Sequence, residues 1–160
     1  MAGATYKRVM CEIDPGVKFF PVEAKYTLNR QANNVGRRVG ESLQGRAYIW
    51  VDAAQIDNLP QTAQVELWKM ATESKDPLHK VSITYYLDDS DKVLSNIEFM
   101  GWISVFQYNN PKVSNLPGAG GSLGVGDPTA TASLSFTNLL YLELAVVLDE
   151  ANVTKHKFTK

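Results

Sequence analysis

An alternating segment over residues 46–53 constrains the fold of this chain most strongly. Aliphatic residues alternate along it with aromatic or acidic ones: Ala47, Ile49 and Val51 against Tyr48, Trp50 and Asp52. This period of two predicts a β-strand. A free-standing antiparallel sheet usually leaves one face in water, but this strand carries large apolar groups on both faces. The pattern therefore predicts that something, such as a partner subunit, covers the second face.

The other apolar segments also indicate strands, with a single helix among them. Strands are predicted over residues 5–11, 17–29 with a break near Pro21, 80–87, 92–108 with a bulge near Gly101, and 131–148. The helix is predicted over residues 59–74, where apolar residues share one stripe: Ala63, Leu67, Trp68 and Ala71. These elements predict one mainly β domain over residues 1–160, a small antiparallel barrel or sandwich with the helix on one side.

Residues 30–46 are polar, basic and glycine-rich, which predicts a long loop between two strands. Four arginines supply its positive charge: Arg30, Arg37, Arg38 and Arg46. A loop of this length usually has a function. No aromatic residue lies among the arginines, which disfavours nucleic acid as a ligand. A solvated loop or a contact with an acidic or carbonyl-rich protein surface remain as alternatives.

The overall charge and composition narrow the functional classes. The net charge of the 160 residues is −1, which gives the whole chain no bias toward nucleic acid or membranes. The single cysteine, Cys11, allows no internal disulfide. The first residues lack the apolar segment of a secretory signal peptide. The longest apolar run, over residues 139–148, is interrupted by Glu143 and is too short to span a bilayer.

Patterns for catalysis or metal binding occur only as fragments. Residues 120–124 match G-x-S-x-G, but glycines and prolines flank them where a hydrolase needs a strand and a helix. The acidic turn at 88–91 lacks the glycine and distal glutamate of an EF-hand. His79, His156 and Cys11 are too widely separated for a zinc site; His79 is expected on the surface and Cys11 among packed apolar residues. We therefore expect no catalytic, cofactor-binding or metal-binding residues, and no enzyme activity.

The order of short motifs along residues 20–148 resembles one known family. A strand ending in Y-x-L-x-R precedes N-x-x-G-R-x-x-G, an alternating strand, a Leu-Trp pair in the helix, and I-E-F-x-G-W-I-x-x-F-x-Y. The residues that carry the likeness are Tyr26, Leu28, Arg30, Asn34, Gly36, Arg37, Gly40, Leu67, Trp68, Phe99, Trp102 and Tyr108. In this order and spacing the chain resembles the haemolysin-coregulated protein (Hcp) family, the tube subunit of bacterial type VI secretion systems, in its Bacteroidetes-like variant.

The resemblance implies a mainly β fold, a compact antiparallel β-barrel of two sheets with one flanking α-helix. It also implies that six copies form a homo-hexameric ring and that rings stack into a tube. Contraction of a sheath would drive this tube from a baseplate, tipped by a spike protein, with effector cargo in the lumen. The protein would start in the bacterial cytoplasm and leave through the type VI machine without a signal peptide, with no nucleic-acid partner and no membrane insertion.

Two surfaces would then carry the assembly. The loop over residues 30–46 would reach the neighbouring ring through a basic and polar set: Arg30, Asn34, Arg37, Arg38 and Arg46. Tyr48 and Trp50 would contact a neighbour within the same ring. A second loop, over residues 109–130, is longer than the family would lead us to expect, and a flexible tail is expected over 150–160. A tube subunit of a phage-like contractile tail, or a small-ligand-binding β-barrel, remain as alternatives.

Overall fold

The computed structural model describes residues 7–32, 38–73, 78–87, 91–109, 138–148 and 154–159, with only the backbone for residues 31, 32 and 38–42. These residues form eight strands and one helix: β1 (Val9–Ile13), β2 (Val17–Phe19), β3 (Glu23–Ala32), β4 (Arg38–Asp52), α1 (Gln61–Thr72), β5 (His79–Tyr86), β6 (Val93–Asn109), β7 (Leu139–Val147) and β8 (Lys155–Phe158). The prediction of a mainly β domain with one helix is confirmed.

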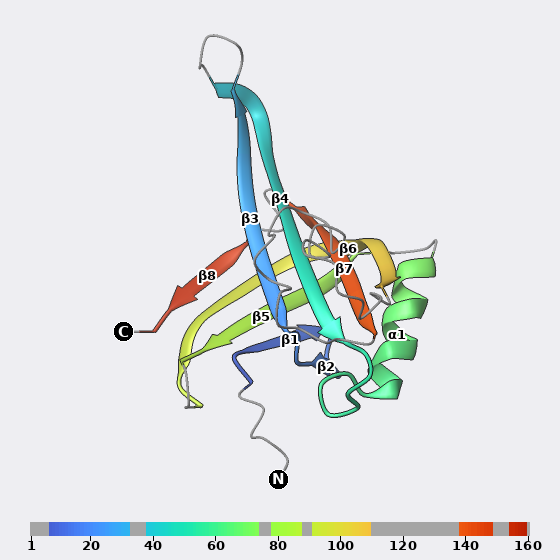
Figure 1. The fold of residues 1–160 in the computed structure, drawn as a ribbon. Helices are drawn as coiled ribbons and strands as arrows, with labels where there is room; N and C mark the ends of the chain where they lie inside the picture. Colours follow the sequence, from blue (N-terminus) through green and yellow to red (C-terminus); the bar gives the residue numbers. More distant parts are fainter. Residues whose placement is uncertain are drawn as a thin grey trace, which may run out of the picture.

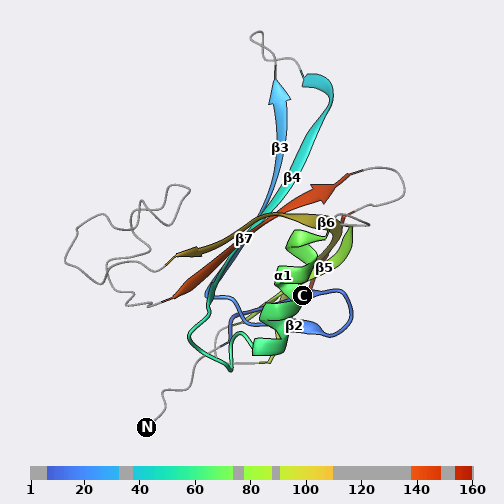
Figure 2. The ribbon, with the colours of Figure 1, turned by 90° about the vertical axis from the view of Figure 1, so that its right-hand side faces the viewer.

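All eight strands join one antiparallel sheet, in the order β2-β1-β5-β6-β7-β4-β3, with β8 also paired to β6. Two layers arise because β6 takes part in both. It pairs with β5 along residues 93–101 and with β7 along residues 100–109. β8 pairs with residues 95–98 of β6. Figures 1 and 2 show β3 and β4 rising together beyond the rest of the domain.

The core lies between the two layers and follows the alternation of the sequence. Ala47, Ile49 and Val51 of β4 are fully buried, as the period of two predicts. The facing layer contributes other fully buried side chains: Cys11, Ile13, Val81 and Ile83. Across the core, the Tyr26 ring lies 5.3 Å from the Phe99 ring. Burial raises the pKa of the Cys11 thiol well above its usual range, so this residue packs as an apolar side chain.

The helix α1 begins after Pro60 and packs against β6 and β2. Ala63 and Leu67 are buried, as the apolar stripe predicts, but Trp68 is 55% exposed. The Trp68 ring packs edge-on against Phe106 of β6, with 5.3 Å between the centroids. The stripe of buried residues is therefore narrower than the sequence indicates.

The structure corrects the prediction for residues 30–46. β3 extends to Ala32 and β4 begins at Arg38, so strands occupy most of the range that was expected to be a loop. β4 pairs with β7 only from Gly45 onward. Residues 29–32 and 38–44 are therefore the described part of this hairpin that leaves the domain, and we call the segment 29–44 the arm. A second correction concerns the C-terminal tail, where residues 155–158 form β8.

His79 is buried, which contradicts its expected position on the surface. Its Nδ1 lies 2.6 Å from Oδ2 of Asp14, and the other carboxylate oxygen of Asp14 accepts a hydrogen bond from the Lys80 amide at 3.0 Å. The Lys80 carbonyl in turn accepts from the Asp14 amide at 2.8 Å. This clamp joins the β1–β2 turn to the start of β5, and the sequence alone does not reveal it.

Removal of this clamp should destabilise the fold. Asp14 has a positive φ of 52°, a conformation that costs alanine more than aspartate or asparagine. Asp14→Ala also leaves buried His79 without a partner, so we expect a loss of about 2–4 kcal/mol in the free energy of unfolding. Asp14→Asn keeps an acceptor and tolerates the turn, and should lose less than half as much. Urea denaturation measures both, and equal losses in the two variants would contradict this role of the carboxylate.

Candidate assembly surface

The described residues show no arrangement suited to catalysis by a metal. Among them, no group of three or more His, Cys, Asp or Glu side chains could hold a metal ion. The part of the chain with assigned positions also contains no helix that is long and apolar enough to cross a membrane. The G-x-S-x-G pattern at 120–124 lies outside the described residues. The features that stand out are instead strand edges and a sheet face.

β3, β4, β7 and residues 102–109 of β6 form a four-stranded layer with two open edges. Within the described sheet, β3 pairs only with β4. At the opposite side, residues 102–109 of β6 pair only with β7, because β5 reaches no further than Gly101. Open edges carry unpaired backbone donors and acceptors, which favour pairing with another strand.

The hydrogen bonds around β3 show which of its backbone groups face the open edge. The Trp50 carbonyl accepts from the amide of Val22, just before β3, at 2.8 Å, so Trp50 turns its backbone groups toward β3. Glu23, which is paired with Trp50, therefore turns its backbone groups toward β4, and Ala24 turns its own away. The Tyr85 hydroxyl donates to the Ala24 carbonyl at 3.0 Å, from the other side. Because backbone groups alternate in direction along an antiparallel strand, Tyr26 and Leu28 point their amides the same way as Ala24. These amides are available to a strand added beside β3.

Tyr85 should make the fold sensitive to high pH. Burial, and to a lesser extent the nearby Cys11 sulfur, raises the pKa of Tyr85 to about 12 from the ordinary value of 10.0. The unfolded chain releases this proton first, so the stability is fully present below about pH 10 and falls as pH rises toward 12. Tyr85→Phe should flatten this fall in denaturation experiments. An unchanged slope between pH 10 and 12 would contradict the assignment.

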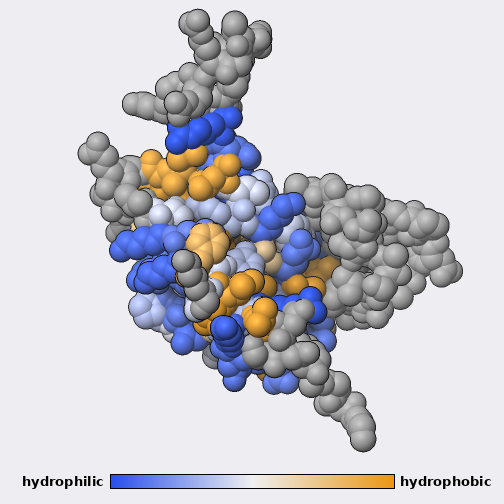
Figure 3. All heavy atoms as spheres, turned by 90° about the vertical axis from the view of Figure 1, so that its left-hand side faces the viewer, coloured by the Kyte–Doolittle hydropathy of each residue, from blue (hydrophilic) through white to orange (hydrophobic). Residues whose placement is uncertain are grey.

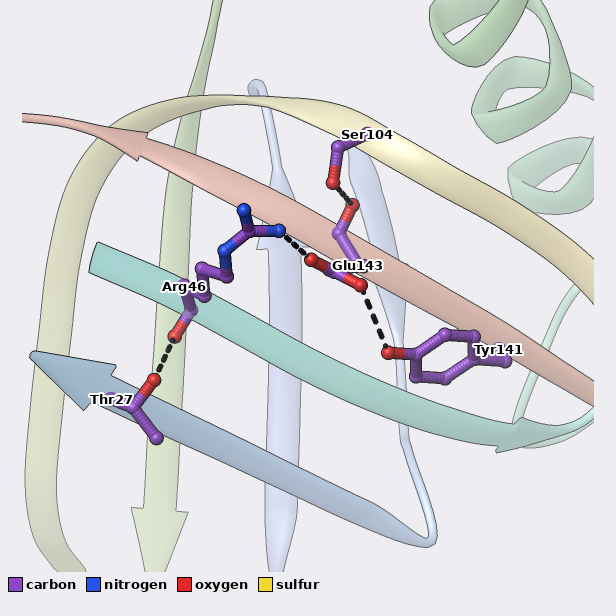
Figure 4. Close-up of polar contacts among 5 residues, drawn as sticks. All are labelled: Thr27, Arg46, Ser104, Tyr141 and Glu143. Carbon is purple, nitrogen blue, oxygen red and sulfur yellow. Dashed lines mark hydrogen bonds and ion pairs between the residues drawn. The ribbon is translucent and has the colours of Figure 1, made fainter. Parts of the chain in front are cut away.

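The face of the layer that points away from the core carries a charged network (Figure 4). An ion pair joins Arg46 of β4 to Glu143 of β7, and the second oxygen of that carboxylate accepts from the Tyr141 hydroxyl at 3.2 Å. Ser104 of β6 donates to the Glu143 carbonyl at 3.0 Å. Burial, followed by the Glu143 charge, raises the pKa of Tyr141 above its usual range. The network therefore ties three neighbouring strands together.

Aromatic rings lie beside this network on the same face. The Trp50 ring is 5.2 Å from Tyr141 and 6.5 Å from Tyr48. Tyr141 is only 7% exposed, whereas Tyr48 and Trp50 are half-buried. Sequence reasoning identified Tyr48 and Trp50 but missed Tyr141 and Glu143. The available signal was Glu143 itself, a single charge within an otherwise apolar run.

The residues predicted for ring stacking are distributed along the arm and its base. Arg30 is exposed on β3. Asn34 and Arg37 lie outside the described residues, and Arg38 is described only by its backbone as the first residue of β4. Arg46 lies just below the arm and is paired with Glu143 of its own chain. The structure therefore places Arg30, Arg38 and Arg46 on one hairpin, and the role of all five residues in stacking stays a prediction.

The comparison with known proteins relates this architecture to tube proteins. No family profile and no curated protein sequence matches the chain. Among solved structures, Hcp1 from Flavobacterium johnsoniae aligns with a TM-score of 0.57 and 13% identity, over 87% of this chain and 89% of that one. A second Hcp protein aligns with a TM-score of 0.56 and 7% identity, over 94% and 98% of the two chains.

A third similar structure comes from a larger assembly. A chain of the sheath–tube complex of the PVC extracellular contractile injection system, in its extended state, aligns with a TM-score of 0.51 and 9% identity, over 96% and 90% of the chains. The chain has the Hcp-like fold. At such low identities the likeness concerns the fold, and it agrees with the resemblance found in the sequence.

Proposed function

We propose that this chain is the subunit of a type VI secretion inner tube, built from rings of identical copies. The observation that carries the proposal is the four-stranded layer with an open edge on each side. In a ring, β3 of one copy would pair with residues 102–109 of β6 in the next. Such a contact is heterologous, because two different surfaces meet, and a rotation that closes gives a ring.

The number of strands in the layer suits this pairing. The four strands alternate in direction because every pairing among them is antiparallel. Rotation about a ring axis preserves strand direction, so an even number of strands brings β3 and the neighbouring β6 together in antiparallel orientation. The other layer, β2-β1-β5-β6-β8, has five strands and would meet its neighbour in parallel. Closure through the four-stranded layer therefore keeps every strand pair antiparallel, as within the chain, whereas closure through the five-stranded layer would not.

Closure of this layer would also fix which face lines the lumen. The core, α1 and the other strands all lie on one side of the layer, so they would surround the closed wall from outside. The opposite face, with Arg46, Glu143, Tyr48 and Trp50, would face inward toward any cargo. In such a ring Tyr48 and Trp50 lie on β4, one strand away from the junction at β3. Their proposed role within the ring is therefore to stabilise β4 beside β3.

Replacement of Trp50 distinguishes a lumen position from a subunit contact. Trp50→Ala removes ring contacts with Tyr141 and Tyr48, which should lower the free energy of unfolding by about 1–2 kcal/mol. If Trp50 lines the lumen, the rings should still form at wild-type concentration. Light scattering across a dilution series measures this. Dissociation of the rings at concentrations where the wild type stays assembled would place Trp50 in the interface instead.

The surface on the β3 side supports an assembly contact there. Figure 3 looks onto this side and shows hydrophobic patches between hydrophilic ones, including one just below the arm. Val22, which directly precedes β3, and Leu28 within β3 are 40% and 49% exposed. Exposed apolar side chains beside unpaired strand edges are typical of surfaces that become covered.

The proposed partners follow from this role. Six copies would form each ring, with the basic arm reaching the next ring along the tube. A contractile sheath would surround the tube, with spike and baseplate proteins at its end and effectors in the lumen. Export would occur from the bacterial cytoplasm through the machine itself. A subunit of a phage-like contractile tail is the second candidate, favoured by the likeness to a chain of the PVC sheath–tube complex.

Electron microscopy of the purified protein tests the proposal. Negative-stain images of the wild-type chain should show rings with six-fold symmetry and a central opening, and stacks of rings at higher concentration. A monodisperse monomer across the whole concentration range would contradict the tube function. Stabilisation of that monomer by a hydrophobic ligand would then support the ligand-binding barrel.

A further inference from the structure

The C-terminal strand β8 lies on the surface of the domain, on the side opposite α1 (Figure 1). All four of its residues are exposed, and among the described strands it pairs only with residues 95–98 of β6. Two hydrogen bonds fix its ends. The Thr159 amide donates to the Leu94 carbonyl at 3.1 Å, and the hydroxyls of Tyr26 and Thr154 are 3.0 Å apart. Few contacts therefore oppose the departure of β8 from the sheet.

The edge of β6 that β8 covers is held in place by other contacts. On their opposite side, the same residues 95–98 pair with β5. The Asn96 side chain also donates to the hydroxyls of Ser82 and Thr84 on β5, at 2.9 Å each. Ile97 is buried in the core. Departure of β8 would therefore leave an ordered strand with an open edge, and such an edge accepts another strand.

The two faces of β8 match this edge in different ways. On one face Lys155 lies directly opposite Glu98, a cross-strand pair of opposite charge. On the other face His156 lies opposite Ile97, and its ring is 3.9 Å from the ring of Phe158. A strand that suits this edge therefore alternates between basic residues and residues with rings, as β8 does.

The linker before β8 is longer than the position of β8 requires. β7 ends with Val147 opposite Met100, and β8 begins with Lys155 opposite Glu98, so the two strands follow each other closely along β6. Two positions along a strand correspond to about 7 Å, whereas the segment 148–154 can span about 25 Å when extended. The linker therefore allows β8 to leave its own β6 and reach the β6 of a second copy while β7 stays in place.

We infer that residues 95–98 of β6 are a strand-binding site, which the chain fills with its own β8. When that strand is displaced, the site accepts the C-terminal strand of a second copy. Tethering keeps the chain's own strand at a high local concentration, so β8 acts as a removable cap in dilute solution. The site lies outside the four-stranded layer, so the inference does not depend on the tube function.

Disulfide trapping between two chains tests the site. The acceptor chain carries Glu98→Cys and ends at Val153, and the donor is a full-length chain with Lys155→Cys. In dilute solution with oxidised glutathione, the disulfide between them should form at least about tenfold faster than with a full-length Glu98→Cys acceptor, whose own β8 competes. The native Cys11 is fully buried and should take no part in the exchange.

A matched control and a folding check complete the experiment. Lys18→Cys on the same truncated chain places an exposed cysteine on β2, at the other edge of the five-stranded layer, and should react only at the background rate. Equal rates for the truncated and full-length acceptors, or for Glu98→Cys and Lys18→Cys, would overturn the inference. Loss of the fold in the truncated chain, measured by circular dichroism, would also overturn it, because β8 would then be required for folding rather than being a removable cap.

Discussion

Ala24→Pro is expected to leave a folded monomer that no longer forms rings. The Ala24 amide points toward the open edge of β3, so proline at this position removes a donor that the monomer does not use. The carbonyl remains, and with it the hydrogen bond from Tyr85. Ala24 lies in the row of Ile49, Leu142 and Phe106, level with the middle of the open part of β6. Size-exclusion chromatography with light scattering should report a monomer where the wild type is assembled.

Proline at the next residue provides the matched control. Lys25 pairs with Tyr48, and its amide points into the ladder with β4. Lys25→Pro should therefore break a hydrogen bond inside the monomer and lower its thermal stability, in contrast to Ala24→Pro. Circular dichroism during heating compares the two variants. Rings that still form in Ala24→Pro at the wild-type concentration would contradict a junction through the β3 edge.

Gly101→Ala should cause a large loss of stability, comparable with that of Asp14→Ala. A Cβ at this position would lie 2.6 Å from the Ala145 carbonyl oxygen and 3.3 Å from the Phe99 ring. Gly101 pairs with His79 of β5 on one side and Val146 of β7 on the other, so β6 has little freedom to move. We expect a loss of about 3 kcal/mol in the free energy of unfolding, at the upper end of the usual cost of overpacking.

Urea denaturation of Gly101→Ala alongside Leu94→Ala tests this expectation. Leu94 lies on the same strand but is 50% exposed, so its truncation should cost less than about 1 kcal/mol. The comparison separates the effect of the close approach between Gly101 and the Ala145 backbone from the effect of any substitution in β6. Equal losses in the two variants would show that the strand shifts to accept the methyl group, and that the junction of the two layers tolerates it.

The sequence predicts the core strands well because burial on one face imposes a period of two. Ala47, Ile49 and Val51 lie in the core as the alternation indicates, and Cys11 packs among apolar residues. The helix is found two residues inside each predicted end, over Gln61–Thr72. Trp68 was predicted to be buried with the apolar stripe, but its ring packs edge-on against Phe106 and stays exposed. The position of a residue in the stripe does not distinguish these two arrangements.

Other features depend on partners that are distant in the sequence. The sequence of the arm has no apolar alternation, so its strands were predicted as a glycine-rich loop. β8 has only four residues, all of them exposed, and it is a strand because it pairs with residues 95–98 of β6. His79 is buried because of Asp14, 65 positions away, and Arg46 meets Glu143 across 97 positions. Local patterns carry no signal for such contacts.

The candidate assembly surface was foreseen only in part. Tyr48 and Trp50 were identified because a strand with two apolar faces implies a cover. The open edges of β3 and β6 were not predicted. A strand has an open edge only if no other strand pairs with it there, and the local sequence pattern does not determine the order of the strands. The even number of strands between these edges likewise becomes visible only once β6 is seen to serve both layers.

Amide hydrogen exchange at the β3 edge tests the central claim most directly. The amides of Tyr26 and Leu28 point toward the proposed junction, whereas the Lys25 amide is already paired within the monomer. We expect exchange at Tyr26 and Leu28 to slow at least about tenfold when the protein passes from dilute monomer to assembled rings, with little change at Lys25. Equal exchange of Tyr26 and Leu28 in monomer and assembly would show that copies do not meet through this edge.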